Sequence, residues 1–160
     1  MGKSRDNALV EDLILACTGE GVSSKTAQRA IRALCRHYGG QMTYIPAKKE
    51  DGTSAKNLRS VLADAVGDSD AEKILGRIMA LYGSMQLYFP LERTAFRKTI
   101  ALEIYAQCGN DGITMNDLAR NYGISFTLAY DLWKLGRHEK IRPTMPYLPF
   151  LELAEYNNSD

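Results

Sequence analysis

Residues 113–134 read ITMNDLARNYGISFTLAYDLWK, and this stretch decides the fold that we predict for the C-terminal part of the chain. Thr114 is of the type that caps a helix, and Ala119 is small enough to let that helix cross another closely. Gly123 follows four residues later and gives the backbone the freedom that a sharp turn needs. Ser125 is placed to cap a second helix. Two short helices around a glycine-containing turn form a helix-turn-helix, which the stretch therefore predicts.

The second helix of this motif is expected to enter the major groove of DNA, with its first residues at the base edges. Its outward positions carry side chains that suit bases or phosphates, and the end of the first helix suits contacts with the DNA backbone. An aspartate on the outward side, Asp131, suits a cytosine amine or an ion pair with Lys134. A plain helical hairpin is the alternative interpretation, and Tyr130 is equally suited to core packing. The predicted DNA-binding residues are Arg120, Asn121, Ser125, Phe126, Thr127, Tyr130, Lys134 and Arg137.

The charge of this region supports a local nucleic-acid surface. Residues 120–142 contain five basic and two acidic residues, a balance of 5 − 2 = +3. The whole chain has a net charge of only +1, so the remainder is net acidic. A basic region in an otherwise acidic chain is the footprint expected of a DNA-binding element.

An internal repeat organises the N-terminal part of the chain. Residues 37–46, HYGGQMTYIP, align without gaps on residues 81–90, LYGSMQLYFP, at an offset of 44 residues. The preceding amphipathic segments also align, from Ala27 onto Ala71. Each copy therefore predicts a helix, a glycine stop, a short strand and a proline. Because a lone short strand is not stable, the two strands are expected to pair with each other or with a second chain.

The fold class predicted from these patterns is mainly α. A helical N-terminal region with two short strands precedes the C-terminal helix-turn-helix. We divide the chain into residues 1–91 with the repeats, residues 92–142 with a linker helix and the helix-turn-helix, and residues 143–160 as an extended tail. The linker helix is expected to run from 92 to 107 without a break. Prolines at 143, 146 and 149 favour the extended tail.

Composition excludes several classes of protein. Hydrophobic residues make up 45% of the 160 residues and charged residues 24%, which is typical of a soluble globular chain. We see no signal peptide and no stretch long enough to cross a membrane, so we expect a cytoplasmic protein with no membrane partner. Three scattered cysteines and two histidines argue against a disulfide framework and a zinc site.

Catalysis is not expected. The available acid–base groups include Glu103, Asp117 and His138, and nothing in the sequence clusters them with a nucleophile, a phosphate-binding loop or metal-ligand spacing. The sequence therefore predicts no enzyme, no catalytic residue, no cofactor and no metal.

The strand unit at 71–90 and the run LARNYGISFTLAY at 118–130 together resemble the Mor/C family of phage Mu-type transcription activators, over about residues 70 to 150. The resemblance implies a homodimer whose N-terminal helices and strand form the interface, with the strand pairing across it. It also implies that the helix-turn-helix reads a double-stranded DNA dyad repeat and activates middle or late phage promoters with host RNA polymerase.

The resemblance assigns the strand unit to the dimer interface. The predicted dimerisation residues are Gly83, Gln86, Tyr88, Phe89 and Pro90, with Gly39, Tyr44 and Pro46 in the first copy. Two departures from the family matter: Asp131 and Glu139 make the DNA-reading segment less basic, and the extra repeat in residues 1–55 leaves open which strand forms the interface. A repressor or antagonist of the same fold and a protein-interaction module without DNA affinity are the alternative functions.

Overall fold

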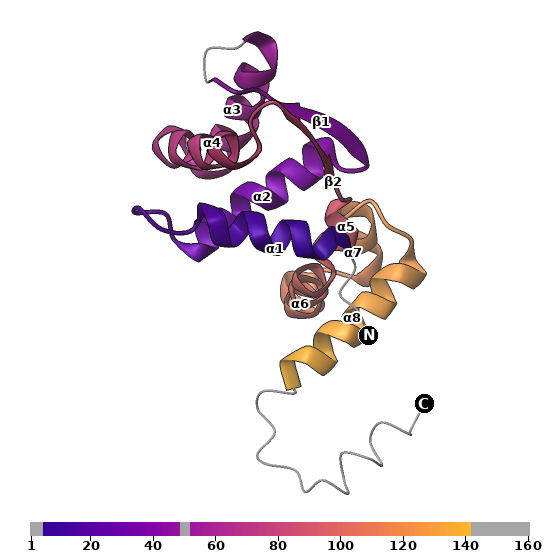
Figure 1. Ribbon diagram of the computed structural model, residues 1–160. Coiled ribbons are helices and arrows are strands. Elements are labelled where there is room, and N and C mark those ends of the chain that lie inside the picture. Colours follow the sequence, from indigo (N-terminus) through magenta and orange to yellow (C-terminus); the bar gives the residue numbers. More distant parts are fainter. Residues whose placement is uncertain (1–4, 49–51, 142–160) are drawn as a thin grey trace, which may run out of the picture. The chain divides into compact units, whose positions relative to one another are not determined.

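A computed structural model describes residues 5–48 and 52–141, and these are mainly α-helical, as predicted (Figure 1). The chain forms two compact units that meet between Phe96 and Arg97. The first unit contains α1 (Arg5–Cys17), α2 (Ser24–Tyr38), β1 (Gln41–Ile45), α3 (Gly52–Val66), α4 (Asp68–Tyr82), β2 (Met85–Phe89) and α5 (Glu92–Ala95). The second contains α6 (Arg97–Gln107), a 3-10 turn (Asn110–Gly112), α7 (Met115–Asn121) and α8 (Phe126–Ile141). The predicted tail, 143–160, lies outside the described residues.

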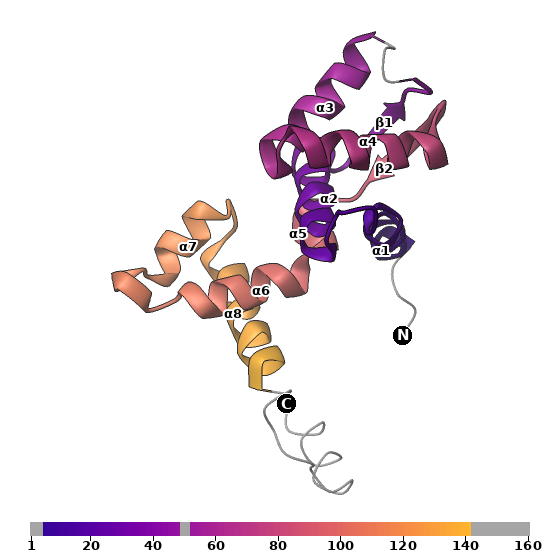
Figure 2. The ribbon, with the colours of Figure 1, turned by 90° about the vertical axis from the view of Figure 1, so that its left-hand side faces the viewer.

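The core of the first unit is built on the two repeat helices. Each buries one apolar face: α2 buries Ile31 and Leu34, and α4 buries Ile74 and Ile78. Helix α1 packs against α2, and α3 packs against both α2 and α4 (Figure 2). Removing these aliphatic side chains from water is the main favourable contribution to folding, at about 25 cal/mol per Å² of apolar surface.

The two strands pair with each other within the chain, which resolves the alternative that the sequence left open. They are antiparallel, with Thr43 opposite Leu87 at the centre of the register. These two residues are also equivalent in the repeat, because 43 + 44 = 87. The two copies are therefore related by an approximate two-fold rotation through this pair. The flanking hydrogen bonds obey the same relation: Gly40 N–H donates to Phe89 O, and Ser84 N–H donates to Ile45 O, both at 2.8 Å.

The glycines that follow the two repeat helices permit a close backbone approach. Gly39 and Gly83 have φ of −56° and −54°, values that any residue can adopt. A Cβ atom on Gly39 would nevertheless lie 2.3 Å from Cys35 O, and one on Gly83 would lie 2.5 Å from Met79 O. The glycines are needed because there is no space for a side chain.

Three helices make up most of the second unit, and α6 and α8 pack closely against each other. At their contact, a Cβ atom on Gly136 would lie 2.0 Å from Ala101 O, so only glycine lets the two backbones meet there. Ile104 of α6, Leu118 of α7 and Leu132 of α8 are buried in the core of this unit. The close contact holds α8 in place along its length.

The prediction of one unbroken helix from 92 to 107 is wrong. The chain leaves helical geometry at Phe96, with φ of −111° and ψ of 28°, and this break separates α5 from α6. Phe96 is 4% exposed, and its N–H donates to Glu92 O at 2.8 Å, which closes α5. Local spacing is continuous across the break, so the periodic pattern alone gave no sign of it.

Candidate nucleic-acid interface

The first helix of the predicted motif begins with a reciprocal cap. Asp117 N–H donates to Thr114 Oγ1 at 3.2 Å, and Thr114 N–H donates to Asp117 Oδ2 at 2.9 Å. The hydrogen bonds from the Thr114 hydroxyl and N–H lower the pKa of the Asp117 carboxyl. This capping box fixes where α7 starts. Thr114 was predicted as the cap, whereas Asp117, noted in the sequence only as an acid–base group, supplies the second half of it.

The turn between α7 and α8 has the predicted geometry. Gly123 adopts φ of +63°, in the left-handed region that favours glycine. Ile124 N–H donates to Ala119 O at 2.9 Å, which fixes the turn against the end of α7. Ser125 Oγ then accepts from Leu128 N–H at 3.1 Å and caps α8, as predicted.

Helix α8 has one buried side and one continuous exposed side. Ala129, Leu132 and Gly136 are buried against the rest of the unit. The opposite side, which we call the α8 stripe, consists of Phe126, Thr127, Tyr130, Asp131, Lys134 and Arg137, all exposed. Arg120, Asn121 and Ser125 are exposed at the end of α7 and in the turn. The eight residues predicted to bind DNA are therefore all exposed, from the end of α7 along α8.

Two cations of the α8 stripe are held by aromatic rings. The Lys134 ammonium lies 4.7 Å from the centroid of the Tyr130 ring, and its Nζ is 3.7 Å from Asp131 Oδ1. The Arg137 guanidinium lies 5.8 Å from the Trp133 ring. Cation–π contacts of this kind orient a charge without removing it from solvent.

Tyr130 combines the two roles that the sequence left open. Its ring stacks on Trp133 at 6.0 Å with an interplanar angle of 12°, and Trp133 also contacts Tyr105 of α6. Tyr130 is nevertheless 44% exposed. The aromatic row thus anchors α8 to α6 and leaves the Tyr130 edge accessible.

Sequence reasoning missed two groups that position this surface. Tyr122 OH donates to Glu103 Oε2 at 3.0 Å and accepts from Gln107 Nε2 at 3.2 Å, which ties the turn to α6. Gly136 permits the close approach of α6 and α8. A glycine in the middle of a helical pattern was the available signal for the second, because glycine disfavours helices without a packing reason.

The predicted dimerisation residues occupy three kinds of place. Phe89 and both prolines, Pro46 and Pro90, are buried. Tyr44 and Gln86 face each other across the two strands, and Tyr44 is 47% exposed. Tyr88 lies opposite Met42 and is 43% exposed, and Gly39 and Gly83 lie at the close approaches described above. The strand edges that face each other are paired inside one chain, and a dimer role for these residues stays a prediction.

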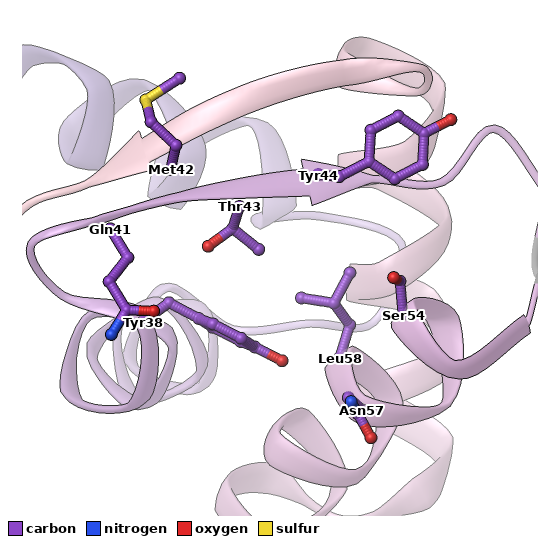
Figure 3. Close-up of a pocket in the computed structure, with 8 residues that line it drawn as sticks. All are labelled: Tyr38, Gln41, Met42, Thr43, Tyr44, Ser54, Asn57 and Leu58. Carbon is purple, nitrogen blue, oxygen red and sulfur yellow. The ribbon is translucent and has the colours of Figure 1, made fainter.

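A cavity of about 230 Å³ opens under β1 in the first unit (Figure 3). Thr43 points into it toward Tyr38 of α2 and Leu58 of α3, whereas Met42 and Tyr44 point away on the other side of the strand. Its lining residues offer hydroxyl and amide groups without a carboxylate, an imidazole or an amine. Across residues 5–48 and 52–141, no cluster of three or more His, Cys, Asp or Glu side chains is arranged to hold a metal ion.

Two cysteines behave as small apolar residues. Cys17 and Cys35 are buried in the first unit, and burial raises the pKa of their thiols to about 11 and about 12. Neither thiol is therefore activated as a nucleophile. In the part of the chain with assigned structure, none of the helices has the length and apolar character needed to cross a membrane.

Comparison with known proteins agrees with the architecture. The family model described as the Mor transcription activator family matches residues 49–148, well over half of the chain. The match begins just before α3 and includes the second repeat, α7 and α8, whereas α1, α2 and β1 lie before it. No curated protein and no solved structure matched the chain. On the strength of this match, the chain belongs to the Mor transcription activator family.

Proposed function

We propose that the protein is a sequence-specific DNA-binding activator of middle or late phage promoters that works with host RNA polymerase. The family supplies the activator role. The observation that carries DNA binding is the α8 stripe: it lies exposed behind a capped turn, on the second helix of a helix-turn-helix. In such motifs this side of the second helix contacts base edges, while flanking basic residues contact phosphates.

Each neutralised phosphate releases bound cations, so the affinity for DNA falls as salt rises. We expect Lys134→Ala and Arg137→Ala each to weaken binding to any duplex and to reduce the slope of log K against log salt by about 1. Lys56→Ala, an exposed lysine of α3, is the matched control and should leave the slope unchanged. Fluorescence anisotropy of labelled duplexes at several salt concentrations measures all three. Absence of binding by the intact protein at low salt, or slopes identical in all variants, contradicts the proposal.

We also propose that two copies act together on a dyad site, because one small module contacts too few bases for useful specificity. The edges by which β1 and β2 pair are occupied within the chain, so a second copy has to contact either the outer strand edges or the outward face of the sheet. The outward face of the sheet exposes Met42 and Tyr88, at 59% and 43%, and is suited to this role. Sedimentation equilibrium should give twice the 17.8 kDa chain mass. A single-chain mass both free and on DNA rules out the homodimer without affecting DNA binding.

Activation itself is tested separately. In vitro transcription from a bound phage promoter with purified bacterial RNA polymerase should give more transcript when the protein is added. A fall in transcript at saturating protein favours the repressor alternative over activation.

A further inference from the structure

We propose that Phe126 and Thr127 read the methyl groups of thymine, so that the protein selects sites with thymines where α8 enters the major groove. This inference rests on the proposed DNA binding and goes beyond it by naming the chemical group that is recognised. It starts from the order of residue types along the α8 stripe.

The first two turns of α8 lack the side chains that read purines. Bidentate hydrogen bonds to guanine come from Arg or Lys, and those to adenine come from Asn or Gln. None of these four residue types occurs from 126 to 133, where the sequence is FTLAYDLW. Lys134 is the first of them, two turns into the helix. Purine readout by paired hydrogen bonds is therefore missing at the end of the helix that lies deepest in the groove.

Two polar side chains near the start of α8, Ser125 and Asp131, already have partners in the protein. Ser125 Oγ accepts from Leu128 N–H at 3.1 Å as the helix cap. Asp131 Oδ1 lies 3.7 Å from Lys134 Nζ, and that ammonium also lies over the Tyr130 ring. Beside the hydroxyls of Thr127 and Tyr130, the start of the helix then presents mainly apolar side-chain surface.

That apolar surface is large and exposed. Phe126 is the first residue of α8 and is 51% exposed, and Tyr130, one turn later on the same side, is 44% exposed. Thr127 is exposed beside Phe126 and adds a methyl group. The thymine methyl is the one apolar group that standard base pairs present in the major groove, and Phe and Thr are among the side chains that contact it. The exposed side chains of Arg120 and Arg137 are suited to bind the DNA phosphates on either side of the bases.

The test removes only the methyl groups. Duplexes are selected from a random-sequence pool with the full-length protein, and the best one is resynthesised with deoxyuridine replacing each thymidine in turn. We expect one or more of these changes to weaken binding about fourfold, the effect of losing one buried methyl-sized group. Phe126→Ala or Thr127→Ser should abolish the uridine effect at its own position. Because both residues are exposed, the variants should unfold at the wild-type temperature.

Arg137→Ala is the control, since it should weaken binding and keep the uridine effect. Equal affinity for thymidine and deoxyuridine duplexes at every position overturns methyl recognition and leaves DNA binding intact. A uridine effect that persists in both Phe126→Ala and Thr127→Ser also overturns it, because other residues must then read the methyl groups. Failure to bind any duplex at low salt removes the proposed function, and this inference with it.

Discussion

The two helix–strand repeats of the first unit have the same backbone geometry and differ in the side chains that contact neighbouring helices. Helices α2 and α4 are offset by 44 residues at both ends, and so are β1 and β2. The close approaches also correspond: Gly39 lies against Cys35 O and the backbone of Leu91, and Gly83 lies against Met79 O and the backbone of Ala47. What the repeats share is therefore the geometry of strand pairing.

The differences lie in capping and charge. Helix α2 begins with a Ser23 cap that accepts from Thr26 N–H at 3.1 Å, whereas α4 follows Gly67 without a side-chain cap. On α2, Arg32 and Arg36 bind Glu92 at 2.7 and 2.9 Å. The repeat equivalents of these three residues are a glycine, an alanine and a lysine, at 76, 80 and 48, which cannot form that cluster.

This contrast indicates which parts of the unit are interchangeable. Gly39 and Gly83 leave no room for a side chain, because backbone atoms occupy the space around them. The residues of each repeat that contact α1, α3 or α5 differ between the two copies, since each copy has different neighbours. Three changes test this division.

The largest expected effect follows from filling either close approach. Gly39→Ala and Gly83→Ala should each lower the free energy of unfolding by about 1–3 kcal/mol, the usual cost of forcing atoms into packed space. Urea denaturation followed by circular dichroism measures both. Similar losses support the equivalence of the two copies, whereas a neutral result in one of them shows that its glycine is not sterically required. Gly67→Ala is not a suitable control, because Gly67 has φ of +88°, but the exposed Ser60→Ala on α3 is.

A smaller effect should follow from the charge cluster that only the first repeat has. Partial burial opposes the charge on Glu92, but hydrogen bonds from Arg36 and Arg32 outweigh it and lower the pKa of this carboxyl below its ordinary 4.5. A lowered folded-state pKa contributes stability above pH 4.5, and this contribution is lost as the pH falls through the folded value. Glu92→Gln should cost about 1 kcal/mol at pH 7 and remove that part of the acid sensitivity.

The matched variant in the second repeat is Glu72→Gln. It breaks an ion pair with Arg59 whose two side chains are 41% and 38% exposed, so its effect should be smaller. Thermal unfolding from pH 7 to pH 3 compares the two variants with the wild type. If Glu92→Gln keeps the full acid sensitivity, the cluster does not stabilise the first repeat in this way.

The smallest effect concerns the residue before each strand. Gly40 and Ser84 are equivalent and both left-handed, with φ of 81° and 66°. Ser84→Gly should stabilise the protein by about 0.5 kcal/mol, because relief of the left-handed strain exceeds the extra freedom of glycine in the unfolded chain. Gly40→Ser should destabilise it by about 0.5 kcal/mol, through φ alone, since a Cβ atom there would meet Leu91 Cδ2 at an ordinary 3.6 Å. If neither Ser84→Gly nor Gly40→Ser changes the free energy of unfolding, the turn relaxes around either residue.

Sequence reasoning reached the features that depend on local signals. Thr114, Gly123 and Ser125 each act through neighbours a few residues away, so α7, α8 and the turn between them could be predicted, and the gap-free repeat revealed both strands. The break at Phe96 could not be predicted, because it depends on burial of that ring rather than on spacing. The need for Gly136 was equally hidden, since it arises from Ala101 on a helix that is distant in sequence. Whether the two strands pair within one chain or between two chains could not be predicted, and only the register in the structure decides it.

That pairing has a consequence for how the sheet responds to dilution. Two strands on separate molecules meet at a rate set by protein concentration, and their association weakens as copies become scarce. Here α3 and α4 connect β1 to β2, so each strand experiences a fixed, high effective concentration of the other. The sheet should therefore persist at low protein concentration, at which a sheet formed by strands from two molecules would dissociate. Tethering also lets one strand mutate without the same change appearing in the other.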